Sequence, residues 1–248
     1  MLKHFSLHEK NNSNPASRFL RSIFSAGNIE TDRPDQTESA ALVPKNYLQI
    51  ESGFLYEKEN NCENFSHPTI NWRYGVNDFF EVHLVTELVT EHFPTEKSSG
   101  LSPLTFGLKV KLTEETKVLP KISFLANLQT RKWGSKNFQT PHLAPSFRFL
   151  FQQTLSDRLQ LGYNVGAEWN GETPDADGIY TLSLAYALTE KLGSFAEVYG
   201  FINKYEKADH RFDGGLTYLM TKDLQADLSA GMGLSKISPE YFISAGIS

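Results

Sequence analysis

From Tyr47 to the end of the chain, apolar and polar residues alternate with a period of two, the pattern of β-strands with two different faces. The segment "LQLGYNVGAEWN" (159–170) places Leu, Leu, Tyr, Val, Ala and Trp on one face, and Gln, Gly, Asn, Gly, Glu and Asn on the other. Residues 104–113, 180–189 and 224–235 repeat this alternation. The pattern predicts about 12 strands, at residues 47–57, 68–76, 79–90, 103–113, 119–131, 145–155, 158–170, 179–189, 192–203, 209–220, 223–235 and 240–247.

The links between these strands alternate in length. Short polar links of turn-forming residues, such as "ND" at 77–78, "SD" at 156–157 and "TKD" at 221–223, join every second pair of strands. Longer links lie between them, at 58–67, 91–102, 132–144, 171–178, 204–208 and 236–239. This alternation predicts an antiparallel up-and-down meander. Because the predicted number of strands is even, both ends of the meander lie on the short-turn side.

Three features indicate that the apolar face meets lipid and the polar face meets a lumen. The polar face is rich in glycine, the strands are long enough to cross a bilayer at a tilt, and aromatic residues gather at both strand ends of the apolar face. These aromatic residues are Tyr74, Phe80, Tyr186 and Tyr218 near the short turns, and Trp169, Tyr180 and Tyr241 near the long links. We therefore predict an all-β fold, an about 12-stranded antiparallel up-and-down transmembrane β-barrel. A soluble barrel or lipid-binding β-sheet protein is the alternative.

The chain divides into three parts. Residues 1–28 are polar and unperiodic, so we expect a disordered or polar N-terminal tail. Residues 29–45 form a charged, non-barrel lead-in or plug segment, and residues 46–248 form the barrel. No signal peptide is visible in the first 28 residues, and the chain ends "YFISAGIS" without a terminal aromatic residue.

Composition excludes several classes of function. The 248 residues carry a net charge of −5, which argues against nucleic acid as a partner. The only cysteine, Cys62, excludes an internal disulfide and gives no support to a thiolate metal cluster. No apolar run is long enough for a transmembrane helix.

Four segments resemble one family of outer-membrane β-barrels: "IETDRPDQTESAALVPKNYLQIESGF", "RYGVNDFFEVHL", "FRFLFQQTLSDRLQLGYNVGAEW" and "ADHRFDGGLTYLMTKDLQADLSAGMGLS". The family is the transporter family named for the meta-pathway of phenol degradation, and the resemblance is to its Bacteroidetes-type members. It covers residues 29–248. The resemblance implies an outer-membrane location and transport of small solutes, with hydrophobic or aromatic compounds as one class.

The predicted lumen face carries charged residues that form a substrate path or, alternatively, a structural network of ion pairs. The substrate-path candidates are Arg73, Glu81, His83, Lys109, Arg148, Glu168, Glu197, Asp213 and Asp227. Glu51 shares this face. No nucleophile motif such as G-x-S-x-G is present, so we predict no catalytic residues and no enzyme activity. We also predict no cofactor and no bound metal.

The lead-in contains a distinctive motif, whose members are Thr31, Asp32, Arg33, Pro34, Asp35 and Glu38. Its acidic residues offer oxygen ligands to Ca²⁺, but their spacing is not that of an EF-hand loop. A solvated lead-in is one interpretation. The other is a segment that folds into the lumen and pairs Arg33 with a carboxylate such as Glu51 or Glu81.

These observations favour passive uptake of small molecules across the outer membrane, with outer-membrane lipid as the surrounding partner. Two alternatives stay open. One is a structural or surface-interaction barrel with a closed lumen, and the other is a small barrel enzyme that acts on lipids. The solute and the oligomeric state do not follow from the residues.

Overall fold

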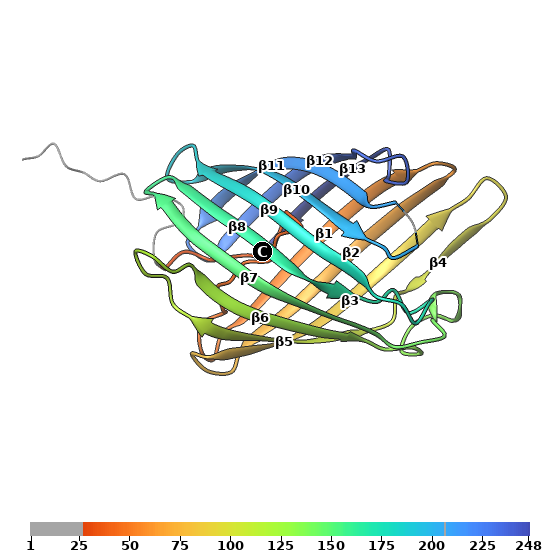
Figure 1. The fold of residues 1–248 in the computed structure, drawn as a ribbon, viewed down its shortest axis with the longest axis horizontal. Coiled ribbons are helices and arrows are strands. Elements are labelled where there is room, and N and C mark those ends of the chain that lie inside the picture. The colour runs from red at the N-terminus through yellow and green to blue at the C-terminus, as the bar shows by residue number, and fades with distance from the viewer. Residues whose placement is uncertain (1–26, 206) are drawn as a thin grey trace, which may run out of the picture.

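The alternating segments form thirteen strands in the computed structural model, which describes residues 27–205 and 207–248. The strands wind around a common axis to form a barrel (Figure 1). They are β1 (Leu48–Glu59), β2 (Cys62–Gly75), β3 (Phe80–His92), β4 (Lys97–Leu101), β5 (Thr105–Thr113), β6 (Lys121–Gln129), β7 (Ala144–Ser156), β8 (Leu159–Glu168), β9 (Asp177–Ala187), β10 (Leu192–Ile202), β11 (Asp209–Thr221), β12 (Leu224–Gly233) and β13 (Tyr241–Ile247), with one short 3-10 helix, η1 (Lys136–Phe138).

The first and last strands close the barrel. β1 pairs antiparallel with β13, from Ser52 opposite Ile247 to Lys58 opposite Tyr241. Every other neighbouring pair is antiparallel as well, and β2 also pairs with β3, so the wall of the barrel closes on itself. The short β4 pairs only with the end of β3, while β5 pairs with the start of β3. The wall therefore has twelve strands, and the predicted up-and-down barrel is confirmed.

Two of the predicted long links are wrong. Residues 58–67 are not a loop, because β1 and β2 continue into a hairpin that turns at Asn60 and Asn61. Asn60 has a φ of 48°, a left-handed conformation that asparagine tolerates. Pro68 lies within β2 at a bulge between Ser66 and Thr69. A bulge accommodates proline because it leaves one residue unpaired, and proline has no backbone N–H. The predicted link 91–102 contains β4.

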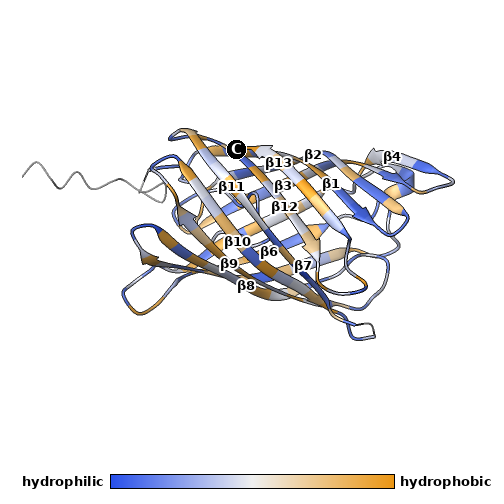
Figure 2. Cartoon of the chain, turned by 90° about the horizontal axis from the view of Figure 1, so that it is seen from above, coloured by the Kyte–Doolittle hydropathy of each residue, from blue (hydrophilic) through white to orange (hydrophobic). Residues whose placement is uncertain are grey.

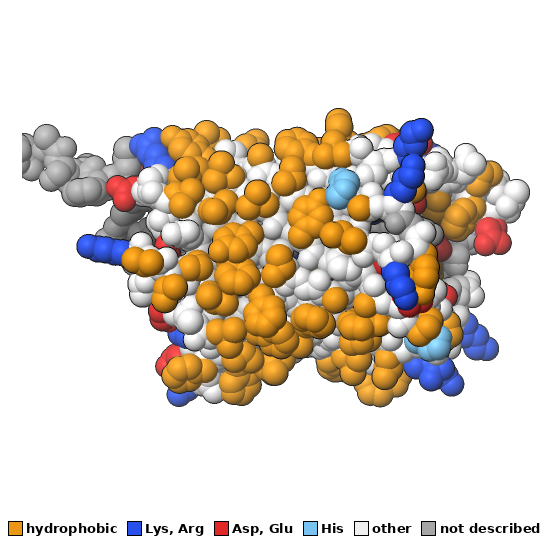
Figure 3. All heavy atoms as spheres, in the orientation of Figure 1, with side chains coloured by type: hydrophobic (Ala, Val, Ile, Leu, Met, Phe, Trp, Pro, Cys, Tyr) orange, Lys and Arg blue, Asp and Glu red, His pale blue; other side chains and the backbone are white. Residues whose placement is uncertain are grey.

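The outer face of the barrel is apolar. Leu182, Val198 and Phe212 occupy the same register on β9, β10 and β11, and their exposed fractions are 46%, 39% and 42%. Hydrophobic and hydrophilic residues alternate along the strands (Figure 2), and apolar side chains cover the middle of the barrel while charged side chains gather at its ends (Figure 3). Such a band fits a lipid bilayer. Among the described residues, no helix has the length and apolar character needed to cross a membrane.

Residues 29–45, here called the lumenal segment, lie inside the barrel and appear in red in Figure 1. They are followed directly by β1. The apolar core is small: Ala40 of the segment packs with Leu125 of β6 and Leu150 of β7. Polar contacts therefore hold most of the segment. Residues 1–26 of the predicted tail lie outside the described part of the chain.

Candidate functional site

The lumenal segment contacts almost the whole circumference of the wall. Its hydrogen bonds and ion pairs reach eleven of the twelve wall strands among the described residues. Their partners are Glu51 (β1), Arg73 (β2), Glu81 (β3), Lys109 (β5), Ser123 (β6), Gln152 (β7), Asn164 (β8), Thr181 (β9), Glu197 (β10), Asp227 (β12) and Ser244 (β13).

Side chains of the wall accept the hydrogen bonds that the backbone N–H groups of this segment donate. The N–H groups of Gln36 and Glu38 donate to Glu197 and Asn164, each at 2.7 Å, and the N–H of Ala40 donates to Gln152 at 3.1 Å. Buried backbone groups need such partners, and an irregular segment has none of its own. The segment is thus held by side chains of the wall.

Two fully buried cations form one anchor of the segment. Arg73 binds Glu51 and Glu81, each at 2.7 Å, and Asp32 at 2.9 Å. Lys109 binds the two carboxylate oxygens of Asp32 at 2.8 and 2.9 Å. Both cations are completely buried. Buried charges require such pairing, and we call this group the basic anchor.

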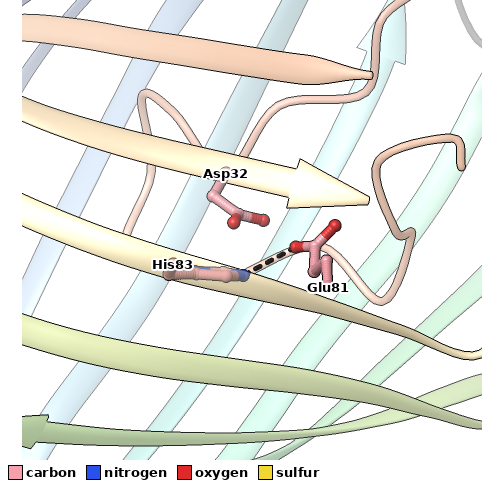
Figure 4. Close-up of side chains that lie close together, drawn as sticks. All are labelled: Asp32, Glu81 and His83. Carbon is pink, nitrogen blue, oxygen red and sulfur yellow. Dashed lines mark hydrogen bonds and ion pairs between the residues drawn. The ribbon is translucent and has the colours of Figure 1, made fainter. Parts of the chain in front are cut away.

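The basic anchor also sets the charge of Asp32. Burial alone would raise the pKa of Asp32, but Arg73 and Lys109 outweigh it and hold this pKa well below its usual range. Asp32 faces Glu81 and His83 of β3, and His83 Nε2 lies 2.7 Å from Glu81 (Figure 4). One ligand atom from each of these three residues lies within 4.8 Å of the others, the spacing of a metal site. However, Arg73 and Lys109 already compensate these carboxylates, so the group is an ion-pair network.

Arg33 occupies a second anchor, on the seam between β1 and β13. Its Nη2 donates to Asp227 Oδ1 and to Ser244 Oγ, each at 2.9 Å. Gly53 and Gly246 face each other across the seam, and a Cβ on either would collide with the Arg33 guanidinium. Asp227 lies directly opposite Gly246 on the next strand. The Arg33 guanidinium therefore occupies the space that the two glycines leave free, and its partner Asp227 lies on the neighbouring strand.

A third contact region is acidic. Glu197 of β10 accepts hydrogen bonds from the Gln36 N–H and the Thr37 hydroxyl. Asp213 lies opposite Glu197 on β11, and both are almost fully buried. Asp35 of the segment is close enough for Glu197 to act on its charge. We call Asp35, Glu197 and Asp213 the carboxyl row.

Two cavities remain beside the segment, where it approaches the short turns. One of about 130 Å³ lies between the segment and β7–β12, with Pro34, Asp35, Phe195 and Thr217 in its lining. Another of about 210 Å³ lies between residues 40–45 and the turn at Asn77 and Asp78. The segment and the inward face of the wall together line both spaces.

All nine predicted path residues lie on the inward face. The structure joins Arg73, Glu81, His83 and Lys109 in one network, and separately pairs Arg148 with Glu168 at 3.1 Å. Glu197 and Asp213 form the carboxyl row, and Asp227 binds Arg33. Arg33 does pair with a carboxylate of the lumen, but this is Asp227 and not Glu51 or Glu81, which bind Arg73 instead.

The motif residues have different roles. Asp32, Arg33, Asp35 and Glu38 contact the wall, and Pro34 lines a cavity. The Thr31 hydroxyl donates to the Arg33 carbonyl and accepts a hydrogen bond from Gln225 of β12. Sequence reasoning missed the neutral partners of the segment. They include Ser123, Gln152, Asn164, Thr181, Gln225 and Ser244. Their position on the inward side of the alternation, among the charged residues, is the signal that marks them.

Comparison with known proteins agrees with this architecture. A model of the family described as "Putative MetA-pathway of phenol degradation" matches residues 31–248. No curated protein matches the chain in sequence.

Several solved structures are similar. The COG4313 outer membrane channel from Pseudomonas putida F1 has a TM-score of 0.67 and 12% identity, over 88% of this chain and 98% of that chain. The NanC porin has a TM-score of 0.55 and 11% identity, over 80% and 98% of the two chains. The KdgM porin has a TM-score of 0.54 and 12% identity, over 79% and 96%. At these identities the similarity establishes the fold, which is that of outer-membrane β-barrels.

Proposed function

We propose that this chain, which belongs to the family described as "Putative MetA-pathway of phenol degradation", is an outer-membrane channel for passive uptake of small molecules, in which the lumenal segment is the plug. The family resemblance also supports a Bacteroidetes-type member and small hydrophobic or aromatic solutes. We assign the chain no enzymatic activity, since the structures it is similar to are a channel and porins.

The observation that carries the proposal is how the segment fills the lumen. A barrel of eight strands is filled by its own side chains, whereas 16–18 strands leave an aqueous channel. This wall has twelve strands, and its inward face carries glycine and small polar residues beside the ion pairs. The lumen is occupied by the segment, which contacts the wall through side chains. Movement of the segment would therefore open a polar path without breaking the barrel ladder.

Single-channel recording in planar bilayers tests the plug directly. Deletion of residues 29–40 removes Asp32 and Arg33 from their anchors, and the expected result is a conductance several times that of the unmodified chain. Heat-modifiable migration on gels would confirm that the deleted variant still forms a barrel. A folded barrel that conducts nothing after the deletion would overturn transport and favour the closed structural barrel.

A reversible lock provides the matched control. The hydroxyl oxygens of Thr37 and Thr181 lie 2.7 Å apart, one on the segment and one on β9. We expect Thr37→Cys with Thr181→Cys, on a Cys62→Ser background, to form a disulfide that fixes the segment to the wall. Oxidised channels should be closed, and reduction should restore conductance. Equal conductance in both states would show that the segment does not gate the lumen.

Liposome swelling would address the solute class. Vesicles containing the deletion variant should swell in small uncharged aromatic solutes and in small sugars alike, because the unplugged lumen is lined by polar side chains. Vesicles containing the intact chain should favour the smaller solutes. Exclusion of all aromatic solutes by both forms would remove that part of the proposal.

A further inference from the structure

The carboxyl row differs from the other anchors in its charge balance. At the basic anchor, Arg73 and Lys109 face the carboxylates, and at the seam Arg33 faces Asp227. Among the described residues, no Lys or Arg nitrogen lies within 4.0 Å of a carboxylate oxygen of Asp35, Glu197 or Asp213. Three acidic groups therefore meet in the lumen without a basic partner.

Buried carboxyl groups without a cation cannot all be ionised at once, because desolvation and like-charge repulsion both oppose it. The Asp213 Oδ1 atom is buried and accepts no hydrogen bond from an N–H or hydroxyl group of the described chain. Glu197 and Asp213 lie opposite each other and within hydrogen-bonding reach, so the two carboxyl groups can share one proton. Burial and the charge of Glu197 raise the pKa of Asp35, which favours its neutral form.

The strands and the part of the segment around the row offer it no free cation among the described residues. On β9, Ser183 and Thr181 are neutral, and on β7, Arg148 donates to the Gln36 carbonyl and pairs with Glu168. On β11, Arg211 is paired with Glu57 and Asp209. On β12, Asp227 is paired with Arg33, and within the segment Asp32 and Glu38 face Lys109. Each nearby cation is thus already bound to another acidic group.

The row is placed to control the segment. Glu197 holds residues 36 and 37 by two hydrogen bonds, and Asp35 is the residue just before them. The 130 Å³ cavity borders the same stretch, since Pro34, Asp35 and Thr37 line it. Release of residues 34–37 would enlarge that cavity along β9–β11. Residues 32 and 40 would stay attached, through Lys109 and Gln152.

We propose that Asp35, Glu197 and Asp213 form a proton-dependent latch, which holds residues 34–37 against the wall when protonated and releases them when ionised. This deepens the proposed function, since the latch regulates the proposed plug. The sign follows from the acidic groups: the docked state binds more protons than the released state, so docking weakens as pH rises.

Amide hydrogen exchange of the full chain in lipid vesicles tests the latch without relying on conduction. Between about pH 5 and about pH 9, we expect the protection factor of the Gln36 amide, which donates to Glu197, to fall at least tenfold. The Ala40 amide, bound to the neutral Gln152, should keep its protection and serves as an internal control. Constant protection at Gln36 over this range would overturn the proposal.

Amide variants separate the latch from general effects of pH. Asp35→Asn lies outside the strands and so spares barrel folding, and Asp35→Asn with Asp213→Asn removes two of the three ionisable groups. Both should keep Gln36 protected at high pH. Glu114→Gln is the matched control, because Glu114 is an exposed carboxylate that pairs with Lys111 away from the carboxyl row, and it should retain the response of the unmodified chain. An unchanged pH response in the double variant would also overturn the latch.

Bilayer recordings made alongside distinguish the two proposals. A loss of protection with rising pH in a chain that never conducts would support the latch and contradict the channel. Conductance that increases after deletion of residues 29–40, with pH-independent protection in the intact chain, would support the channel and contradict the latch.

Discussion

Gly53 and Gly246 lie opposite each other on β1 and β13, and together they leave the space that the Arg33 guanidinium occupies. These two residues pair the first strand with the last, and they also contact the Arg33 side chain that attaches the lumenal segment to the wall. A side chain at either position would displace the flexible end of Arg33 and leave the strand pairing intact.

Gly246→Ala should therefore loosen the segment while sparing the barrel. The added Cβ takes the place of the guanidinium, so Arg33 loses Asp227. We expect a more frequently open channel in single-channel recordings and an unchanged urea midpoint. Gly178→Ala is the matched control, because its Cβ would meet Ile202 at an ordinary 3.7 Å. Equal gating in the two variants would contradict the role of the glycine gap.

Lys109→Met should destabilise the protein strongly. It removes one of two cations from a buried group of carboxylates, and breaking a buried pair costs roughly 3–5 kcal/mol. Lys111→Met, on the same strand, removes an exposed pair with Glu114, for which ~0.2–1 kcal/mol is expected. Urea unfolding in detergent micelles, followed by tryptophan fluorescence, measures both. Similar losses would show that the lumen around Lys109 is well hydrated.

The basic anchor should respond to acid, in contrast to the latch. Arg73 and Lys109 overcome burial and lower the pKa of Asp32, so its contribution to docking is fully present above its unfolded pKa of about 3.9. That contribution is lost as pH falls through the lowered pKa. The Ser39 amide, which donates to Asp32 at 3.0 Å, reports it by hydrogen exchange. Asp32→Asn should reduce Ser39 protection at least tenfold at neutral pH, and the difference from the unmodified chain should shrink only in strong acid.

If the outer face contacts lipid, a charged substitution there should destabilise the barrel most near the middle of the bilayer and least near its surfaces. Leu182 lies midway along β9, whereas Leu188 lies just beyond its end, and both are about equally exposed. Leu182→Arg should lower the stability of the barrel in lipid vesicles by about 2–4 kcal/mol, and Leu188→Arg by about 0–1 kcal/mol. Unfolding titrations in vesicles measure the difference. Equal effects would place the bilayer elsewhere on the barrel.

Much of this fold is predictable because a period of two assigns each residue to a face. Glu197 and Asp213 could be placed on the inward side from their apolar neighbours alone. Alternation does not determine the register around a closed barrel, however, so the pairing of Arg33 with Asp227, 194 residues away, could not be derived. The hairpin at Asn60 was missed because β1 and β2 are polar near it, where a strand leaves the apolar band and loses its alternation.

The spread of the segment's contacts has a consequence for the order of assembly. Its partners range from Glu51 on the first strand to Ser244 on the last, so most of its binding surface is created only when the barrel closes. The segment precedes in the chain every strand that holds it, so its full set of contacts becomes available only after β1 pairs with β13. Complete docking of the segment therefore requires a closed barrel.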